Sequence, residues 1–327
     1  MRTAAVVLGC GVLAVTAAAG EPLPVVVVPQ EASGLERHAA RELAKYLRAM
    51  SGQDVLIATE GQEGSRAAIF VGRTKLGTAA LPKDLASEGF IVRATQHPGR
   101  PALMVVGQSG PGTLYAAYCA LEKLWGVGFF WDGEHIPRVT RWDWPAVDLR
   151  EQPRFRVRQN LQGCAFTYST LHWGRNEWQA EVDWTVKHRF NTLMLPWPSL
   201  DFEVWRSLGI ALPPPSDYDR GRRELIQRVA GYARRLGVKC ILPGYAGGVP
   251  AEFARQHPEA RLVDVKWGES AAVPNLFPSD PWFRRTQIID RLVRAGERAL
   301  KDRAREFRAS RLWCGDCLLY TSPSPRD

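Results

Sequence analysis

The sequence predicts an α/β protein in which a small α/β domain is followed by the first part of a (β/α)8 barrel, about four strands long. Short apolar runs rich in β-branched residues alternate with longer segments whose apolar residues recur at helical spacing. After residue 153 the alternation becomes a regular succession of strand, helix and strand, which is typical of parallel sheets with crossover helices. A doubly wound sheet gives the same pattern, so it stays an alternative to the barrel at this point.

The composition is that of an ordinary globular protein with room for two domains. The chain has 327 residues, of which 45% are hydrophobic and 24% are charged. The net charge of +9 comes from arginines interspersed with acidic residues, without a run of like charge, so we expect no nucleic-acid partner. The 12 tryptophans fit either core packing or stacking against flat ligands such as sugar rings.

The two ends of the sequence are expected to lie outside the fold. Residues 1–20 combine an early arginine, an apolar run and small residues before a polar break, which is typical of a secretory signal peptide. The run is too short for a comfortable membrane span, so we expect no membrane span and a secreted or periplasmic protein. Residues 317–327 continue no earlier pattern and resemble the translation of a sequencing-library adapter. We therefore expect the natural product to continue past Asp316 and this chain to be a fragment.

Residues 21–136 are expected to form the small α/β domain. The apolar run at 23–28 predicts a buried strand. Ser33 and Glu36 then form a capping box at the start of a helix that Gly52 ends. Further strands are predicted at 54–58, 68–72, 89–93 and 102–107.

A glycine-rich segment leads from the last of these strands into a second helix. Ser109 with Pro111 in the first turn predicts the helix start. The glycines at 107, 110 and 112 lack both the Gly-Lys-Ser/Thr ending of a phosphate loop and the spacing of a dinucleotide-binding motif. We therefore expect a tight turn from strand to helix, and no cofactor.

Residues 137–153 are rich in Pro and Trp and are expected to be a linker, and residues 154–316 are expected to be the first half of a barrel. Strands are predicted at 155–161, 192–195, 238–242 and 311–314, and helices at 177–188, 219–236 and 279–307. Half a barrel leaves a strand without a partner and an apolar interior uncovered, so we expect the isolated chain to aggregate or to be unstable.

Two parts of the sequence resemble known glycosidase families. The segment from Gly112 to Phe130, GTLYAAYCALEKLWGVGFF, resembles the small α/β domain that precedes the catalytic barrel in β-hexosaminidases, family 67 α-glucuronidases and family 89 α-N-acetylglucosaminidases. The resemblance implies a hexosaminidase-type accessory domain without catalytic residues.

From Arg154 onward, a set of motifs resembles the opening of the family 89 barrel, in the same order. The motifs are Gln159-Asn160, Cys164, Thr167-Tyr168-Ser169, Trp173, Trp178, Glu181-Val182-Asp183-Trp184, Phe190-Asn191, Leu242–Pro250, Trp267-Gly268, Pro278–Phe283 and Leu312–Asp316. The resemblance implies a glycoside hydrolase that releases terminal α-linked N-acetylglucosamine, with retention, from a glycan or glycoconjugate.

The resemblance also implies where the sugar would bind. Asn160, Cys164 and Trp267 match positions that line the sugar pocket in the family, as a hydrogen-bonding group, a close contact to the ring and an aromatic wall. Retention requires two carboxylates about 5–5.5 Å apart. In the family the acid/base glutamate follows the fourth strand by a few residues, which here falls near Tyr320, and the nucleophile comes later. The resemblance therefore assigns no catalytic residue to this chain and implies that the chain is inactive.

Other candidate residues are expected to be structural. The acidic residues that follow predicted strands are interpreted as solvated charges; they are Asp201, Glu203, Glu252, Glu259, Asp264 and Glu269. The six histidines are isolated, so we expect no metal site. The four cysteines between the expected signal peptide and the tail are widely scattered and are expected to be free and buried; they are Cys119, Cys164, Cys240 and Cys314.

The sequence departs from the family after Trp205, where the family usually carries a longer insertion, and this leaves the specificity open. One alternative is a glycosidase of other specificity, such as an α-glucuronidase-like enzyme with a basic pocket. The other alternative is a non-catalytic carbohydrate-binding or scaffold protein.

Overall fold

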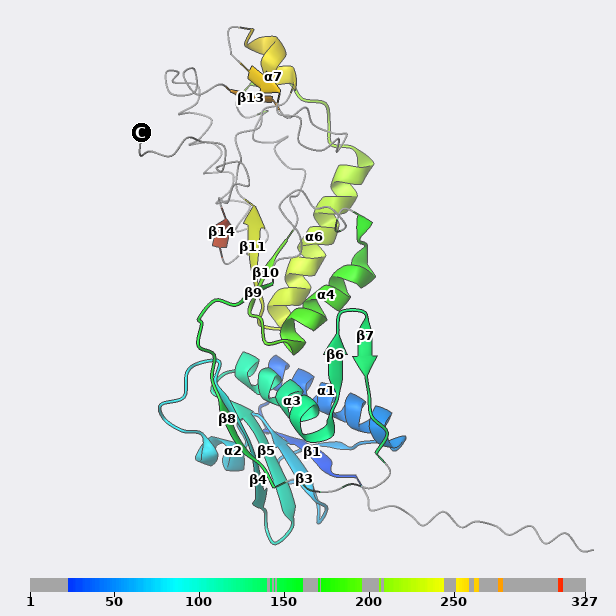
Figure 1. Ribbon diagram of the computed structural model, residues 1–327, viewed down its shortest axis with the longest axis vertical. Helices are drawn as coiled ribbons and strands as arrows, with labels where there is room; N and C mark the ends of the chain where they lie inside the picture. The colour runs from blue at the N-terminus through cyan, green and yellow to red at the C-terminus, as the bar shows by residue number, and fades with distance from the viewer. Residues whose placement is uncertain are drawn as a thin grey trace, which may run out of the picture.

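The computed structural model describes residues 23–139, 142, 144, 146–160, 170, 172–195, 206, 209–243 and 251–258, with short strands at 262–264, 276–278 and 311–313. Two α/β units follow one another along the chain. Figure 1 shows the N-terminal sheet and its helices at the bottom and the second sheet above them.

The N-terminal unit is built on a six-stranded mixed sheet with the order β2-β1-β3-β5-β4-β8. The pairs formed by β1 with β2, β1 with β3, and β3 with β5 are parallel, whereas β4 is antiparallel to both β5 and β8. The strands are β1 (Val25–Val28), β2 (Ile57–Thr59), β3 (Ala68–Val71), β4 (Phe90–Gln96), β5 (Pro101–Gly107) and β8 (Asp148–Glu151). All the strands predicted for this domain are present, with shifted ends.

The strand β8 lies within residues 137–153, the stretch predicted to be a linker. Its residues pair with β4, and an ion pair between Arg93 and Asp148, 2.7 Å long, joins the two strands at the surface. Trp142 of the same stretch is buried and packs against Trp125, with ring centroids 5.2 Å apart. Part of this segment therefore completes the N-terminal unit.

Two long helices, α1 (Gly34–Ser51) and α3 (Gly110–Trp125), cover one face of this sheet (Figure 1). The short helix α2 (Lys75–Ala80) places Leu76 against the opposite face. The predicted capping box of Ser33 and Glu36 is confirmed, since each side chain bonds the other residue's backbone N–H. The predicted stop at Gly52 is confirmed as well, with a left-handed φ of 73°.

The glycine-rich turn between β5 and α3 brings two backbones into contact. A Cβ added to Gly107 would overlap the backbone of Gly112 and Thr113. The Thr113 hydroxyl accepts a hydrogen bond of 3.1 Å from the Gly107 N–H, and Ser109 caps the helix. The glycines let the strand and the helix approach closely, as a tight turn requires.

A small antiparallel hairpin of β6 (Gly128–Phe130) and β7 (Gly133–His135) follows α3 and stands beside the second unit (Figure 1). The sequence pattern did not predict it, because three-residue strands are too short to show a period.

The second unit contains four parallel strands in the order β14-β11-β10-β9. They are β9 (Gln159–Asn160), β10 (Thr192–Met194), β11 (Lys239–Pro243) and β14 (Arg311–Trp313), with helices α4 (Arg175–Lys187) and α6 (Asp217–Arg235) between the first three. Neighbours in space follow one another along the chain, which is the arrangement of a barrel and confirms a partial (β/α)8 barrel of about four strands. The strand predicted at 155–161 is only two residues long.

The remaining described elements lie beyond β11. They are α7 (Ala251–Gln256) and an antiparallel pair formed by β12 (Leu262–Asp264) and β13 (Leu276–Pro278). The helix predicted at 279–307 lies outside the described residues.

One hydrophobic core extends through both units. Leu43, Tyr115 and Tyr118 from the N-terminal helices belong to the same buried cluster as Trp178 on α4 and Val229 on α6. The two units are therefore joined by packing as well as by the chain. Among the described residues, no helix is both long and apolar enough to cross a membrane.

We predict that Gly107→Ala lowers the free energy of unfolding by about 2–4 kcal/mol, because the new methyl group overlaps backbone atoms that cannot move aside. The matched control is Gly34→Ala, since Gly34 has open space around its Cα, so this change should be neutral or slightly stabilising. Urea unfolding followed by circular dichroism measures both. Equal effects of the two substitutions would contradict the close packing of β5 and α3.

Candidate functional site

The candidate binding face lies at the carboxyl ends of β9, β10, β11 and β14. Parallel α/β sheets bind ligands at this end of their strands. In Figure 1 the arrow of β11 points away from the N-terminal unit, so the carboxyl ends lie on the far side from it. The amino ends of the strands face the N-terminal unit instead.

Side chains of the second sheet divide into two rows. Asn160, Leu193 and Cys240 stand in register on β9, β10 and β11. Leu193 and Cys240 belong to the core that contains α4 and α6, so this row faces the helices. Met194 and Ile241 are buried but lie outside that core, as expected for residues on the opposite, barrel-interior face.

Asn160 belongs to the row of side chains that faces the helices. Its side-chain nitrogen donates to the Glu181 carboxylate at 2.6 Å and to the Thr185 hydroxyl at 2.8 Å. Both acceptors lie on α4, and Glu181 is only 2% exposed. These two bonds use both amide hydrogens of Asn160 and hold α4 against β9, so only the side-chain oxygen could bond a ligand. The sugar contact expected for Asn160 stays a prediction.

Sequence reasoning did not identify Glu181 as a partner of Asn160. The signal for it was local: Glu181 and Thr185 are four residues apart on one helix and therefore lie on the same face. The spacing of residues along the chain could not show which strand residue this face of α4 contacts.

The other two predicted site residues, Cys164 and Trp267, lie outside the described residues, so their positions relative to Asn160 stay predictions. Asp201, Glu203, Glu259 and Glu269 lie outside the described residues as well. Glu252 is described, on α7, where its carboxylate is 2.7 Å from the Arg255 guanidinium. An ion pair of this kind on a helix surface fits the expected solvated charge.

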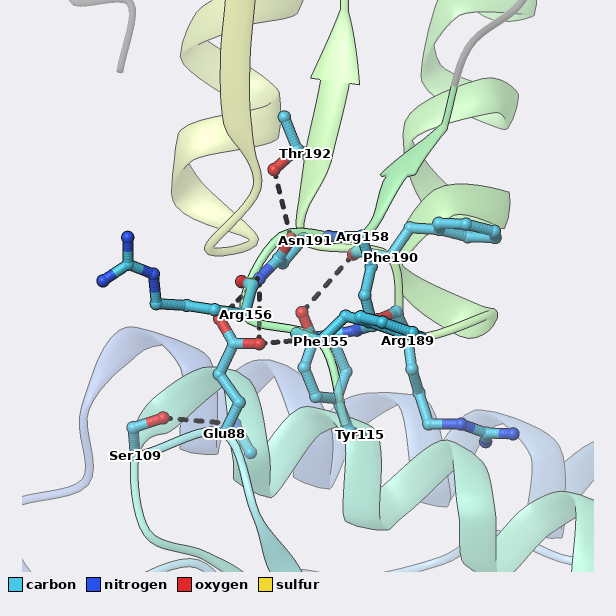
Figure 2. A network of polar contacts seen from close by, with 11 residues as sticks. Glu88, Ser109, Tyr115, Phe155, Arg156, Arg158, Arg189, Phe190, Asn191 and Thr192 are labelled. Carbon is cyan, nitrogen blue, oxygen red and sulfur yellow. Dashed lines mark hydrogen bonds and ion pairs between the residues drawn. The ribbon is translucent and has the colours of Figure 1, made fainter. Parts of the chain in front are cut away.

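The amino ends of the strands carry a dense polar network, which Figure 2 shows. Glu88, in the loop before β4, accepts a hydrogen bond of 2.5 Å from Arg158 and bonds of 3.0 Å from Asn191 to both of its oxygens. Arg158 also donates to the backbone oxygens of Arg189 and Phe155, at 2.7 and 2.8 Å. The network joins the N-terminal unit to the start of the second sheet.

Asn191 lies at the centre of this network and is 1% exposed. Its side-chain nitrogen also donates to the Arg156 carbonyl at 2.8 Å, and its side-chain oxygen accepts from the Arg158 N–H at 2.9 Å and from the Thr192 hydroxyl at 3.1 Å. Each polar atom of the buried amide therefore has a partner, which is the condition for burying it without a large penalty.

Two further contacts surround the network. Tyr115 on α3 donates to the Phe190 carbonyl at 3.4 Å, and burial raises the pKa of its hydroxyl well above the ordinary value. Arg189 pairs with Glu122 on α3 at 2.6 Å and has a left-handed φ of 62°. Because residues at the amino-terminal face of a barrel usually serve stability, we assign this network to domain docking rather than to chemistry.

A second group of titratable residues lies between α1, α4, β7 and α6. Glu134 accepts from Tyr46 at 2.7 Å and from the buried Lys187 at 2.6 Å. Burial opposes the ionisation of Glu134, but these two hydrogen bonds and the positive charges of Lys187 and Lys45 together lower its pKa.

Asp183 and His38 belong to the same group. The Tyr232 hydroxyl donates to Asp183 at 2.5 Å, yet burial dominates and raises the pKa of the carboxyl above its ordinary value. Burial lowers the pKa of His38 below its ordinary value, with Glu42 opposing the shift. Burial therefore shifts the pKa of each group in the direction that favours its neutral form.

Metal and thiol chemistry find no support in the described part of the chain. No group of three or more His, Cys, Asp or Glu side chains there is arranged to hold a metal ion. Cys119 and Cys240 are free and buried, as predicted, and burial raises the pKa of each thiol to about 12. A thiol with so high a pKa is a poor nucleophile near neutral pH.

We predict that Glu88→Ala lowers the free energy of unfolding by about 2 kcal/mol, because Arg158 and Asn191 each lose a partner in a part-buried site. The matched control is Asp84→Ala, which removes an exposed ion pair with Arg150 and should have no measurable effect. Urea unfolding of both variants tests this, and an Asp84 effect as large as the Glu88 effect would argue against the docking role.

A pH-dependent prediction concerns Asp183. Its folded-state pKa is raised, so its contribution to stability is fully present below the unfolded value of 3.8 and is lost as the pH rises through the folded value. Asp183→Asn keeps an acceptor for Tyr232 and removes this loss. The stability of the variant relative to the parent should therefore increase as the pH rises above 3.8, until Asp183 is ionised in the folded parent. Thermal unfolding across this range measures the difference, and a constant or decreasing difference would contradict the assignment.

Two family models match different parts of the chain. Residues 199–302 match the model described as the α-N-acetylglucosaminidase (NAGLU) TIM-barrel domain. Residues 15–119 match the model described as the glycosyl hydrolase family 67 N-terminus. Of the second sheet and its helices, the first match contains β11 and α6, and the second match contains β1 to β5 of the N-terminal unit.

A curated relative agrees with the barrel match. The chain is 25% identical over 224 residues to the human (Homo sapiens) α-N-acetylglucosaminidase, which covers 57% of this chain and 29% of that protein. The chain therefore spans less than a third of the length of this relative.

Solved structures share the fold at low sequence identity. A Streptomyces plicatus β-hexosaminidase variant in complex with its product GlcNAc has a TM-score of 0.56 and 13% identity, covering 93% of this chain and 58% of that one. A Clostridium perfringens family 89 glycoside hydrolase in complex with PUGNAc has a TM-score of 0.51 and 13% identity, covering 80% of this chain and 31% of that one. The chain is therefore similar in sequence to the α-N-acetylglucosaminidases, and it shares its fold with a family 89 glycoside hydrolase and with β-hexosaminidases.

Proposed function

We propose that the full-length protein hydrolyses terminal α-linked N-acetylglucosamine with retention of configuration. The observation that carries the proposal is the match of residues 199–302 to the α-N-acetylglucosaminidase barrel, in the part of the chain that contains α6 and β11. The human relative points to the same substrate. The partner is then a glycan or glycoconjugate with such a sugar at its non-reducing end.

The reaction requires two carboxylates about 5–5.5 Å apart, one as the nucleophile and one as the acid and then the base. The buried or part-buried carboxylates described above have other roles. Glu88 docks the N-terminal unit, Glu181 holds β9 on α4, and Asp183 and Glu134 lie between helices. We place both catalytic carboxylates after β14, in sequence that this chain does not contain, so the chain alone is inactive.

Residues 1–20 are part of the proposal as a signal peptide, which places the mature protein outside the cytoplasm, either secreted or periplasmic. Residues 317–327 are then foreign to the natural product. The natural gene sequence after Asp316 tests whether residues 317–327 are foreign, and an Asn-Glu pair within a few residues of Asp316 favours the enzyme. Another residue in that place favours a protein that binds carbohydrate without cleaving it.

The activity test uses the full-length natural product and this 327-residue chain, each with an aryl α-N-acetylglucosaminide. We expect turnover by the full-length protein, with the α-anomer of the sugar released first when the reaction is followed by NMR. The 327-residue chain should be more than about 1,000-fold slower, since it would lack both catalytic groups. A full-length protein that is inert on α-linked amino sugars would refute the substrate, and an active 327-residue chain would refute the placement of the carboxylates.

One observation favours a second specificity. Residues 15–119 match the family 67 N-terminus, and the resemblance of residues 112–130 to family 67 α-glucuronidases implies the same alternative. This domain carries no catalytic group in the proposed assignment, so it weighs less than the barrel match. An aryl α-glucuronide tested in the same assay distinguishes the two specificities. If the full-length protein cleaves only that substrate, α-glucuronidase activity replaces the N-acetylglucosamine proposal.

A further inference from the structure

The turn of the hairpin β6–β7 carries an exposed tryptophan. Phe130 pairs with Gly133, so Trp131 and Asp132 form the two-residue turn between the strands. Tight turns favour Gly, Asn, Asp and Pro, so the turn itself gives no reason for a tryptophan. Trp131 is 57% exposed and its neighbour Phe130 is 59% exposed, although large aromatic side chains are usually well covered. We call Phe130, Trp131 and Asp132 the hairpin patch.

Neighbouring tryptophans hold the Trp131 ring in place. Its centroid lies 5.9 Å from that of Trp173 and 6.3 Å from that of Trp184. Trp173 packs in turn against Trp178, at 5.0 Å, and Trp178 is buried in the core that joins the two units. The Trp131 ring is thus supported by the protein while more than half of the side chain stays exposed. A side chain fixed in this way loses little conformational entropy when it binds a ligand.

The Phe130 ring is held against the hairpin as well. Phe129 points inward, where its ring packs edge-on against Tyr46 and Tyr118, and strand alternation directs Phe130 to the opposite side. A Cβ added to Gly128, two residues earlier on the same side, would lie 2.6 Å from a ring carbon of Phe130. The Phe130 ring therefore lies back over the backbone at Gly128, and the rest of the ring is open to solvent.

The apolar surface of the hairpin patch is too small for a protein partner. The other exposed large apolar side chains of the described residues belong to the β2 edge, the segment before β9 and the start of α6; they are Leu56, Ile57, Phe155, Val157 and Tyr218. Two aromatic side chains offer at most about 150–250 Å² each, whereas a stable protein interface buries about 800 Å² on each partner. An area of this size fits one or two sugar rings, since a pyranose ring is about as large as an aromatic ring.

The polar group of the hairpin patch suits a neutral ligand that is rich in hydroxyl groups. Asp132 is exposed and has no hydrogen-bond or ion-pair partner among the residues that the structure describes. Glu134, the other acid of the hairpin, already bonds Tyr46 and Lys187. A carboxylate accepts hydrogen bonds from hydroxyl groups and repels an anion. The hairpin patch therefore favours a neutral sugar over a uronate or a sulfated sugar.

The hairpin patch lies beside α4, in the outer layer of helices and away from the candidate binding face (Figure 1). The helix α4 runs back from the carboxyl end of β9 toward the amino end of β10. Trp173, just before α4, therefore lies toward the carboxyl ends of the strands, and Trp184 lies toward their amino ends. Trp131 contacts both rings on the flank of the unit, so a ligand bound to it is outside the barrel.

We propose that the hairpin patch is a second, non-catalytic carbohydrate-binding site, which stacks a neutral hexopyranose of a glycan on the Trp131 ring. The C–H groups of a sugar with equatorial hydroxyls pack on the indole, Phe130 contacts the next sugar, and a hydroxyl group donates to Asp132. A glycan held here keeps its other sugars at a high local concentration near the barrel. The proposal goes beyond the proposed function, because the site binds without cleaving and does not depend on which linkage the barrel cleaves.

Calorimetric titration with cellotriose tests this proposal, on the 327-residue chain and on the full-length natural product. Cellotriose is neutral, has equatorial hydroxyls and carries no N-acetyl group, so it is not a ligand of the proposed catalytic pocket. We expect a Kd on the order of 1 mM, because the site is open and makes few contacts. Trigalacturonate, an anionic trisaccharide, should bind at least about 3-fold more weakly, because Asp132 repels it.

Variants of the hairpin patch separate stacking from packing. Trp131→Met keeps an apolar side chain against Trp173 but has no ring, so it should weaken cellotriose binding at least about 5-fold. Trp131→Tyr keeps a ring and should stay within about 3-fold of the parent. The matched control is Tyr218→Ser on α6, since Tyr218 has the same 57% exposure as Trp131, and this change should leave the Kd unaltered. Circular dichroism of each variant checks that it is folded.

Three results would overturn the proposal. Absence of cellotriose binding, or equal binding by a folded Trp131→Met variant, would mean that the ring binds no sugar. Tighter binding of trigalacturonate than of cellotriose would mean that the site selects anions. A dimer that dissociates in the Trp131→Met variant would mean that a second copy covers the hairpin patch. The activity assay is separate, so a protein that binds cellotriose through Trp131 but cleaves no α-linked amino sugar would refute the proposed function alone.

Discussion

The buried side chain of Asn191 connects three stretches of chain that are far apart in sequence. It bonds the Glu88 carboxylate from the N-terminal unit, the backbone at Arg156 and Arg158 before β9, and the Thr192 hydroxyl at the start of β10. A buried amide is stable only when its polar atoms have partners, so this one site fixes where the N-terminal unit sits beneath the second sheet. The continuous core of α1, α3, α4 and α6 then packs around that arrangement.

This docking gives the two ends of the parallel sheet different roles. The amino ends are occupied by the network around Glu88 and Arg158 and by the contact of Tyr115 with Phe190 (Figure 2). The opposite, carboxyl ends are the ones that parallel barrels use for chemistry. The accessory unit thus supports the barrel from below and lies far from the proposed sugar site.

Local sequence signals predicted the elements that rest on local interactions. The capping box of Ser33 and Glu36 and the left-handed Gly52 bound the first helix where the sequence indicated, since each involves residues within a few positions of one another. The strand β8 was not predicted, because its residues are charged and alternate only weakly. Its pairing with β4 depends on a partner more than fifty residues away, as the ion pair of Arg93 with Asp148 shows.

The sequence by itself determined the order of strands and helices, the helix ends and the glycosidase-like motifs around Gln159 and Asn160, because periodicity, capping and motif order are properties of nearby residues. Only the tertiary structure decided which way those motif residues point. Asn160 faces Glu181 on α4, and Asn191 bonds Glu88, because hydrogen bonds between distant segments form only where the packed core brings them together. Such pairings leave no spacing in the chain that could reveal them beforehand.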